Sequence, residues 1–213
     1  MLLSSPCCVF CIGQVPAAWR AELDSDALRA RARAFKDEAG EEPKHSYPGG
    51  WTGKAWRTDF TDATSPRASR EHGPVALWRV GAVESFRETF EYCPFFEGAG
   101  LERWRVGRGQ DFGWMFYGCE SLRPRLGGWR LPSAITMDEM LAWTGGWGPA
   151  IGDWLEGHPN PEAVDVQWML KNNQGALPPA VRGSKSRKER REALPGWGRY
   201  WSRCKISWNI TGW

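Results

Sequence analysis

The chain has 213 residues and a formal net charge of +3, and it is rich in tryptophan, with 15 Trp against only 4 Tyr. This length fits one domain, or one domain with tails, and is sufficient to bury a hydrophobic core. No apolar run approaches the roughly 18 residues that a membrane helix requires, so we expect a soluble protein without a membrane span.

The first residues, MLLSSPCCVFCIGQVPA, do not fit a secretory signal peptide, because no basic residue precedes the apolar stretch and Pro and Cys interrupt it. Cys7, Cys8 and Cys11 with His45 lack the paired spacing of a tetrahedral zinc site. We therefore expect reduced thiols, no metal, no cofactor and a cytoplasmic location, with an organelle as the alternative.

The first third of the chain predicts little regular structure. We expect a flexible leader over 1–44 that contains one Ala/Arg-rich helix at 24–39, capped by Asp24 or Ser25. The apolar stripe of this helix (Leu28, Ala32 and Phe35) is thin, which predicts weak docking or none. Residues 40–74 are punctuated by Gly, Pro, Ser and Asp and predict loops.

The regular part of the chain begins near Pro74. Apolar spacing predicts helices at 82–93, 136–143 and 150–157, the second of them with a capping box formed by Thr136 and Glu139. Alternating or aromatic-rich stretches predict strands at 75–80, 111–118, 127–131, 162–170 and 204–210. No repeat period is apparent, and helices and strands mix without regular alternation. This order favours an α+β domain over 45–213, with a curved antiparallel sheet and helices packed on one face.

The predicted core lies between 74 and 170, and a basic insertion follows it at 181–203. The residues expected to be buried are Val83, Phe86, Phe90, Phe112, Met115, Leu141, Ile151, Val164 and Val166. The stretch 181–205 holds nine Lys or Arg against two Glu, which is typical of a solvated segment or a contact for phosphate or an acidic partner.

Several fragments, read in order, resemble the eukaryotic translation initiation factor 4E family, which binds the mRNA cap. The matching fragments are HSYPGGW (45–51), KAW (54–56), AVESFR (82–87), DFGWMFYG (111–118), LGGWRL (126–131), DEMLAWTGGWGPAIGDW (138–154) and CKISWN (204–209). The resemblance implies a non-enzymatic, RNA-binding protein of translation initiation or its regulation, whose ligand is the 7-methylguanosine triphosphate of the cap.

The resemblance also implies a set of cap-binding residues. Trp56 and Trp114 would hold the positively charged base between indole rings, with Trp104 as the alternative to Trp114. Glu120 would accept hydrogen bonds from the guanine edge. The triphosphate would be bound by the basic residues Lys54, Lys171, Arg182 and Lys185.

The chain departs from the family at two functional positions. It has Leu122, Arg123 and Pro124 where the family has its second stacking Trp and the guanine-reading Glu. It also has Arg87 at the position of the family's partner-binding Trp, which would weaken a scaffold protein docked on the helical face.

Two other functions remain open from the sequence. The first is a non-catalytic, Trp-rich subunit of a large ribonucleoprotein or membrane complex, organellar ones included, in which tryptophans anchor interfaces. The second is a carbohydrate-binding module, with indole faces stacked on sugars.

Overall fold

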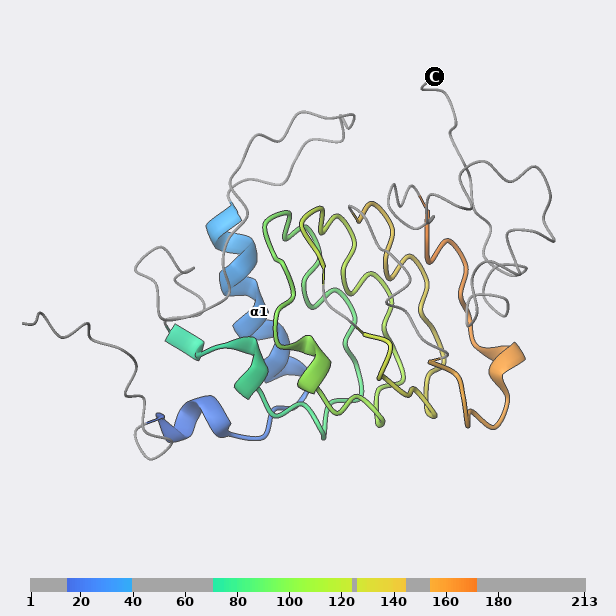
Figure 1. Ribbon diagram of the computed structural model, residues 1–213, viewed down its shortest axis with the longest axis horizontal. Helices are drawn as coiled ribbons and strands as arrows, with labels where there is room; N and C mark the ends of the chain where they lie inside the picture. The colour runs from blue at the N-terminus through green and yellow to red at the C-terminus, as the bar shows by residue number, and fades with distance from the viewer. Residues whose placement is uncertain (1–14, 40–70, 124–125, 145–153, 172–213) are drawn as a thin grey trace, which may run out of the picture.

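The computed structural model describes residues 15–39, 71–123, 126–144 and 154–171. Figure 1 shows these residues as a row of stacked coils with one long helix at the N-terminal end of the row. The helical elements are η2 (Ala17–Arg20), α1 (Ser25–Ala39), η3 (Val75–Leu77), η4 (Leu101–Arg103) and η5 (Pro161–Ala163). None of the helices in this part of the chain is both long and apolar enough to cross a membrane.

Four segments of the chain repeat one backbone path, and we name them together the turn ladder. The segments are residues 85–93, 111–119, 136–144 and 165–171. Isolated parallel bridges join them in register through Ser85, Asp111, Thr136 and Asp165. Each segment also donates backbone hydrogen bonds to the next one, as Phe86 N does to Asp111 O at 2.7 Å. The coils are therefore parallel and stacked, as in repeat proteins.

Tight turns, rather than helices or long strands, form each ladder segment. In the first segment Thr89 N donates to Phe86 O at 3.3 Å, and the turn residue between them, Glu88, has a left-handed φ of 57°. Type II turns have this backbone shape at their third residue. The non-glycine residues with a left-handed φ in the described chain are Glu88, Tyr92, Trp114, Glu139, Trp143 and Trp168.

A polar side chain fixes the start of each ladder segment. Thr136 Oγ1 accepts a hydrogen bond from Asp138 N at 3.2 Å, two residues further on. Asp111 and Asp165 bind the backbone N–H two residues on in the same way, at 2.8 and 2.9 Å. Such local bonds initiate turns and compete with helix formation. Thr136 is thus a turn residue, and the predicted capping box is wrong.

A column of tryptophans crosses the coils. Trp104 follows Trp78 by 26 positions, and Trp129 and Trp154 follow at intervals of 25. Each indole Nε1 donates to a backbone carbonyl of the preceding coil: Trp104 to Val75 at 2.8 Å, Trp129 to Leu101 at 3.0 Å and Trp154 to Leu126 at 2.8 Å. These three carbonyls also accept the backbone N–H of the tryptophan in their own coil.

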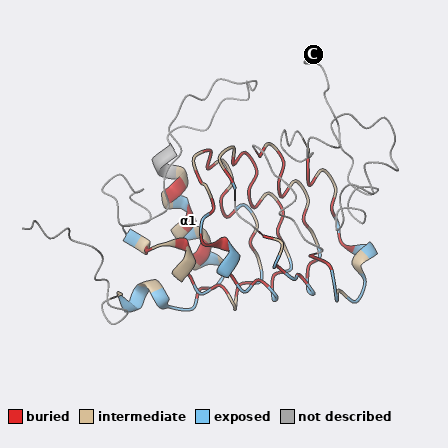
Figure 2. Cartoon of the chain, in the orientation of Figure 1, coloured by how far each residue is buried: buried red, intermediate tan, exposed pale blue. Residues whose placement is uncertain are grey.

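Aromatic rings fill the space inside the coils, and Figure 2 shows buried residues recurring along every coil. The rings of Phe86 and Phe112 stack at 5.0 Å, and those of Phe90 and Phe116 at 5.9 Å. The predicted core is confirmed for Val83, Phe86, Phe90, Phe112, Met115, Leu141, Val164 and Val166, while Ile151 lies outside the described residues.

Helix α1 covers the first coil, as a capping element does in repeat proteins. The helix predicted at 24–39 is confirmed, but the expectation of weak docking is wrong. Leu28, Ala32 and Phe35 are at most 2% exposed, and the Phe35 ring lies 5.4 Å from that of Phe96. Ser25 Oγ also accepts a hydrogen bond from Ser85 N at 3.0 Å, which ties the start of the helix to the ladder.

The predicted α+β fold with a curved antiparallel sheet and helices on one face is wrong. The described residues contain one α-helix and isolated bridges, all of them parallel. The segments predicted as helices at 82–93 and 136–143 are runs of turns. Consecutive four-residue turns return Phe86 and Phe90 to the same side of the backbone, and this spacing resembles that of a helix. The strand predicted at 204–210 lies outside the described residues.

Candidate functional site

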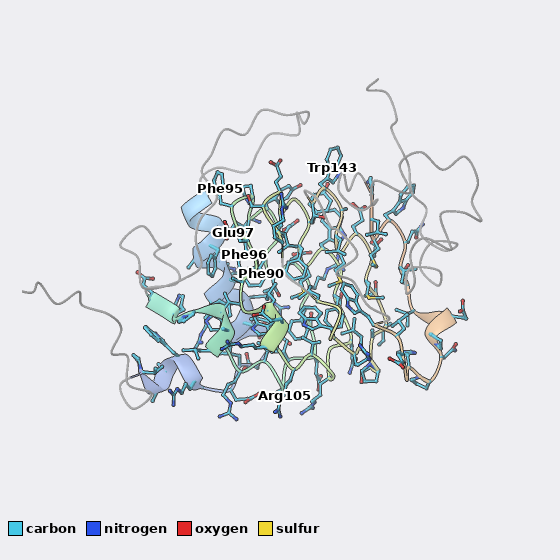
Figure 3. All side chains as sticks on the ribbon, viewed as in Figure 1. Phe90, Phe95, Phe96, Glu97, Arg105 and Trp143 are labelled. Atoms are coloured by element: carbon cyan, nitrogen blue, oxygen red, sulfur yellow. The ribbon has the colours of Figure 1, made fainter. Side chains whose placement is uncertain are left out.

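The outward side chains of the turn ladder form a surface that we name the aromatic–acidic face. Its members are Arg87, Glu88, Glu91, Tyr92, Asp111, Trp114, Asp138, Glu139, Trp143, Asp165, Trp168 and Lys171. The four ladder segments together contain six carboxylates and two basic residues, so this face is negatively charged. In Figure 3, Trp143 lies at the upper edge of the coils.

Because the coils stack in register, carboxylates and indoles alternate from one coil to the next on this face. Glu88, Trp114, Glu139 and Trp168 occupy the same left-handed position in successive coils. Trp114 and Trp168 are only half-buried. The ring of Trp114 stacks on that of Tyr117 at 4.5 Å, with the two planes 18° apart. The Trp114 ring is thus held by stacking while part of it faces solvent.

Two adjacent carboxylates, those of Asp138 and Glu139, are partly withdrawn from water. Burial raises the pKa of Asp138, and the nearby charge of Asp165 raises it further, while a hydrogen bond from Trp114 lowers it. Burial also raises the pKa of Glu139, against the opposing charge of Lys171. One oxygen of each carboxylate, Asp138 Oδ1 and Glu139 Oε2, is buried and has no hydrogen-bond partner among the described residues.

Two lysines of the chain itself show how this face accommodates an ammonium group. Lys171 Nζ lies 3.5 Å from Glu139 Oε1 and 5.5 Å from the centre of the Trp168 ring. Lys36 Nζ, from α1, lies 3.4 Å from Glu91 Oε2 and 5.6 Å from the centre of the Tyr92 ring. In both places the cation lies near a carboxylate and an aromatic ring, which combines ion pairing with cation–π attraction.

The structure brings two of the sequence-predicted site residues to the same face. Trp114 contacts Asp138, and Lys171 also acts on the charge of that carboxylate. Glu120 follows the second ladder segment and is half-buried, and its backbone carbonyl accepts a hydrogen bond from Arg123. The alternative stacking residue, Trp104, is 5% exposed and belongs to the core. The other predicted site residues, Lys54, Trp56, Arg182 and Lys185, lie outside the described residues.

Arg87 does not lie on a helix, so the helical docking face assumed for it is absent from the described part of the chain. Its Nε is 3.2 Å from Glu88 Oε1, and its Nη1 is 3.8 Å from Asp111 Oδ1. Arg87 therefore neutralises part of the acidic face.

The sequence analysis missed the carboxylates Glu91, Asp138 and Glu139. The overlooked signal is the repeat, because the chain aligns with itself at the fragments SFRETFEYC, DFGWMFYGC, TMDEMLAWT and DVQWMLK. That alignment places an acidic or aromatic residue at the same outward position of every coil. Among the described residues, no group of three or more His, Cys, Asp or Glu could hold a metal ion.

Comparison with known proteins identifies one family. No curated protein and no solved structure matches the chain significantly. A family model described as Mycoplasma protein of unknown function, DUF285, matches residues 58–173. The matched region contains all four ladder segments and covers more than half of the sequence. The chain belongs to the DUF285 family.

Proposed function

We propose that this protein is a non-catalytic binding module whose aromatic–acidic face binds a lysine-rich segment of a partner polypeptide. The observation that carries the proposal is the repeated placing of an ammonium group near a carboxylate and an aromatic ring. Lys171 and Lys36 each occupy one such place. The proposed role requires no bond to be made or broken.

A third place of the same kind is offered by Trp114 and Asp138. The Trp114 ring is half-buried and stacked on Tyr117, and the half-buried Asp138 carboxylate lies beside it. An ammonium group from a partner would lie beside the Asp138 carboxylate and the face of the indole. Cation–π attraction of this type contributes about 0.5–2 kcal/mol, depending on how far the site is desolvated.

The backbone at Trp114 holds the indole in a defined place. Its φ of 59° is left-handed, and this conformation costs a non-glycine residue roughly 1–2 kcal/mol. The same conformation recurs at Glu88, Glu139 and Trp168, so it belongs to the turn repeat of every coil. Hydrogen bonds of Trp114 N to Asp138 O and of Tyr117 N to Trp114 O hold this residue in the ladder.

Cap binding is a second ligand proposal, and one observation supports it. The base of 7-methylguanosine is a cation, so it could stack on Trp114 with its edge toward the Asp138 carboxylate. The triphosphate would then approach a surface with six carboxylates and two basic residues. The match to DUF285 and the parallel coils add no support for the initiation factor 4E resemblance. We therefore favour a basic polypeptide.

Titration of the purified full chain with a synthetic peptide tests the proposal. The probe is an N-acetylated decapeptide of alternating Lys and Ala, and the control peptide has norleucine in place of Lys. We expect saturable quenching of tryptophan fluorescence by the lysine peptide only. Trp114→Ala and Asp138→Asn should each weaken binding at least fivefold, and Ile135→Ala should leave it unchanged, since Ile135 is an exposed apolar residue outside the face.

A parallel titration with 7-methylguanosine triphosphate separates the two ligands. Quenching by the nucleotide and not by the lysine peptide would overturn the polypeptide proposal and favour cap binding. Equal affinity of the lysine peptide for the wild type and the Trp114→Ala variant would also overturn it.

A further inference from the structure

A groove with four arginines among its ten lining residues lies at the edge of the coils opposite Trp143, and we name it the arginine groove. Figure 3 shows Arg105 at this lower edge. Residues from η2, η3, η4 and the backbone after η3 line the groove: Arg20, Glu22, Ala76, Leu77, Trp78, Arg79, Val80, Gly81, Arg103 and Arg105. Four of these side chains are arginines and one is acidic.

Packing of η4 directs two of the arginines outward. Trp104, which directly follows η4, is 5% exposed and donates its Nε1–H to Val75 O at 2.8 Å. Because the Trp104 side chain points into the core, its neighbours Arg103 and Arg105 point away from the core, and both are exposed. Gly100, with a φ of 98°, allows this arrangement, since a Cβ there would lie 2.6 Å from Ala76 N.

The single carboxylate of the groove is already engaged. Glu22 Oε1 accepts a hydrogen bond from Ala82 N at 3.1 Å, and Glu22 Oε2 lies 3.1 Å from Arg79 Nε. Glu22 therefore neutralises one arginine. Neither Arg103 nor Arg105 forms an ion pair with any described residue, so the groove retains a concentrated positive charge.

The stacking of the coils increases this concentration of charge. Arg79, Arg105 and Arg130 each follow a tryptophan of the Trp column, and neighbouring coils of a parallel ladder lie about 4.8 Å apart. Like charges on adjacent strands destabilise a fold. Arg79 and Arg130 each have a carboxylate partner, Glu22 at 3.1 Å and Glu156 at 2.9 Å. Arg105, between them, has none among the described residues.

We propose that the arginine groove binds a soluble ligand through a diphosphate group. Arg103 and Arg105 flank Trp104, whose backbone is extended, so their Cα atoms lie roughly 6–7 Å apart. Together with Arg79 from the preceding coil, they offer guanidinium groups to two adjacent phosphates. Guanidinium groups bind phosphate oxygens with paired, charge-assisted hydrogen bonds. This site is separate from the aromatic–acidic face, so neither proposal depends on the other.

Isothermal titration with inorganic pyrophosphate tests the proposal, with sulfate as the competing anion, in 0.15 M KCl on the full chain. We expect one pyrophosphate per chain, bound at least tenfold more tightly than sulfate. The double variant Arg103→Gln/Arg105→Gln should lose at least tenfold in affinity. Arg105→Lys, which keeps the charge and loses the planar donor pair, should lose less.

A matched control uses an arginine of the exposed side of α1. Arg33→Gln removes the same charge outside the groove and should leave the affinity for pyrophosphate unchanged. Circular dichroism melts of all variants establish that they fold. The proposal is overturned if folded wild-type protein shows no saturable binding, if sulfate binds as tightly as pyrophosphate, or if the double variant retains wild-type affinity.

Discussion

Replacing Trp129 by Phe tests whether the Trp column holds the coils together. The indole is 2% exposed, and its Nε1 donates to Leu101 O at 3.0 Å. That carbonyl keeps a second hydrogen bond from Trp104 N, so the loss of the indole bond costs about 1 kcal/mol. The smaller ring leaves a gap against Phe116 and Trp154, whose centres lie 6.5 and 5.9 Å away. We assign about 1–2 kcal/mol to this lost packing.

The expected destabilisation of Trp129→Phe is therefore about 2–3 kcal/mol. Urea unfolding followed by far-ultraviolet circular dichroism measures it, and for a slope near 2 kcal/mol per molar the midpoint should fall by about 1–1.5 M. Trp168→Phe is the control: this ring is half-buried, Phe can still lie beside the Lys171 ammonium group, and we expect a loss below about 1 kcal/mol. Equal midpoints for the two variants would refute the reasoning.

Three further predictions concern the turns, the acidic face and the capping helix. The free energy of unfolding of the Glu88→Gly variant should be about 1 kcal/mol higher than that of Glu88→Ala, because only glycine adopts the left-handed φ without strain. The opposite order of urea midpoints would contradict the turn assignment. Asp138→Asn should raise the melting temperature at pH 7. Burial raises the pKa of Asp138, so the native state binds the carboxyl proton more tightly than the unfolded state and loses stability when this proton dissociates at higher pH. The stability gained by Asp138→Asn should therefore fade below about pH 4, where the carboxyl group is protonated in both states. Melting temperatures measured across pH test this. Phe35→Ala should cost about 3–5 kcal/mol in urea unfolding, and a negligible loss would show that α1 does not cap the coils.

Apolar spacing predicted which residues are buried and misjudged the backbone that buries them. Phe86 and Phe90 lie in the core as expected, since both a helix and a pair of four-residue turns return every fourth residue to the same side. Side-chain hydrophobicity does not distinguish the two backbones. The distinction depends on Ser85 and its counterparts, whose side chains start turns by local hydrogen bonds.

Local propensity also could not predict which residues have a left-handed φ. Gly118 occupies such a position and would have indicated a turn, but Trp114 and Glu139 have low intrinsic preference for it. Stacking of neighbouring coils imposes the conformation on them. Self-comparison of the sequence would have shown the repeat, because the Trp column recurs at nearly constant spacing. The carboxylates of the candidate site follow from that register and cannot be recognised in one coil alone.

The unequal spacing of the ladder segments indicates where this architecture tolerates change in length. Val166 follows Met137 by 29 positions, whereas Met137 follows Phe112 by 25. Trp154 keeps the interval of 25 after Trp129, so the additional residues fall between Trp154 and the next ladder segment, where η5 lies. Evolution by tandem duplication could thus add whole coils, or lengthen this outer connection, without disturbing the shared carbonyls of the Trp column. An insertion of one residue inside a ladder segment would instead move every following side chain of that segment off its place in the four-residue turn repeat.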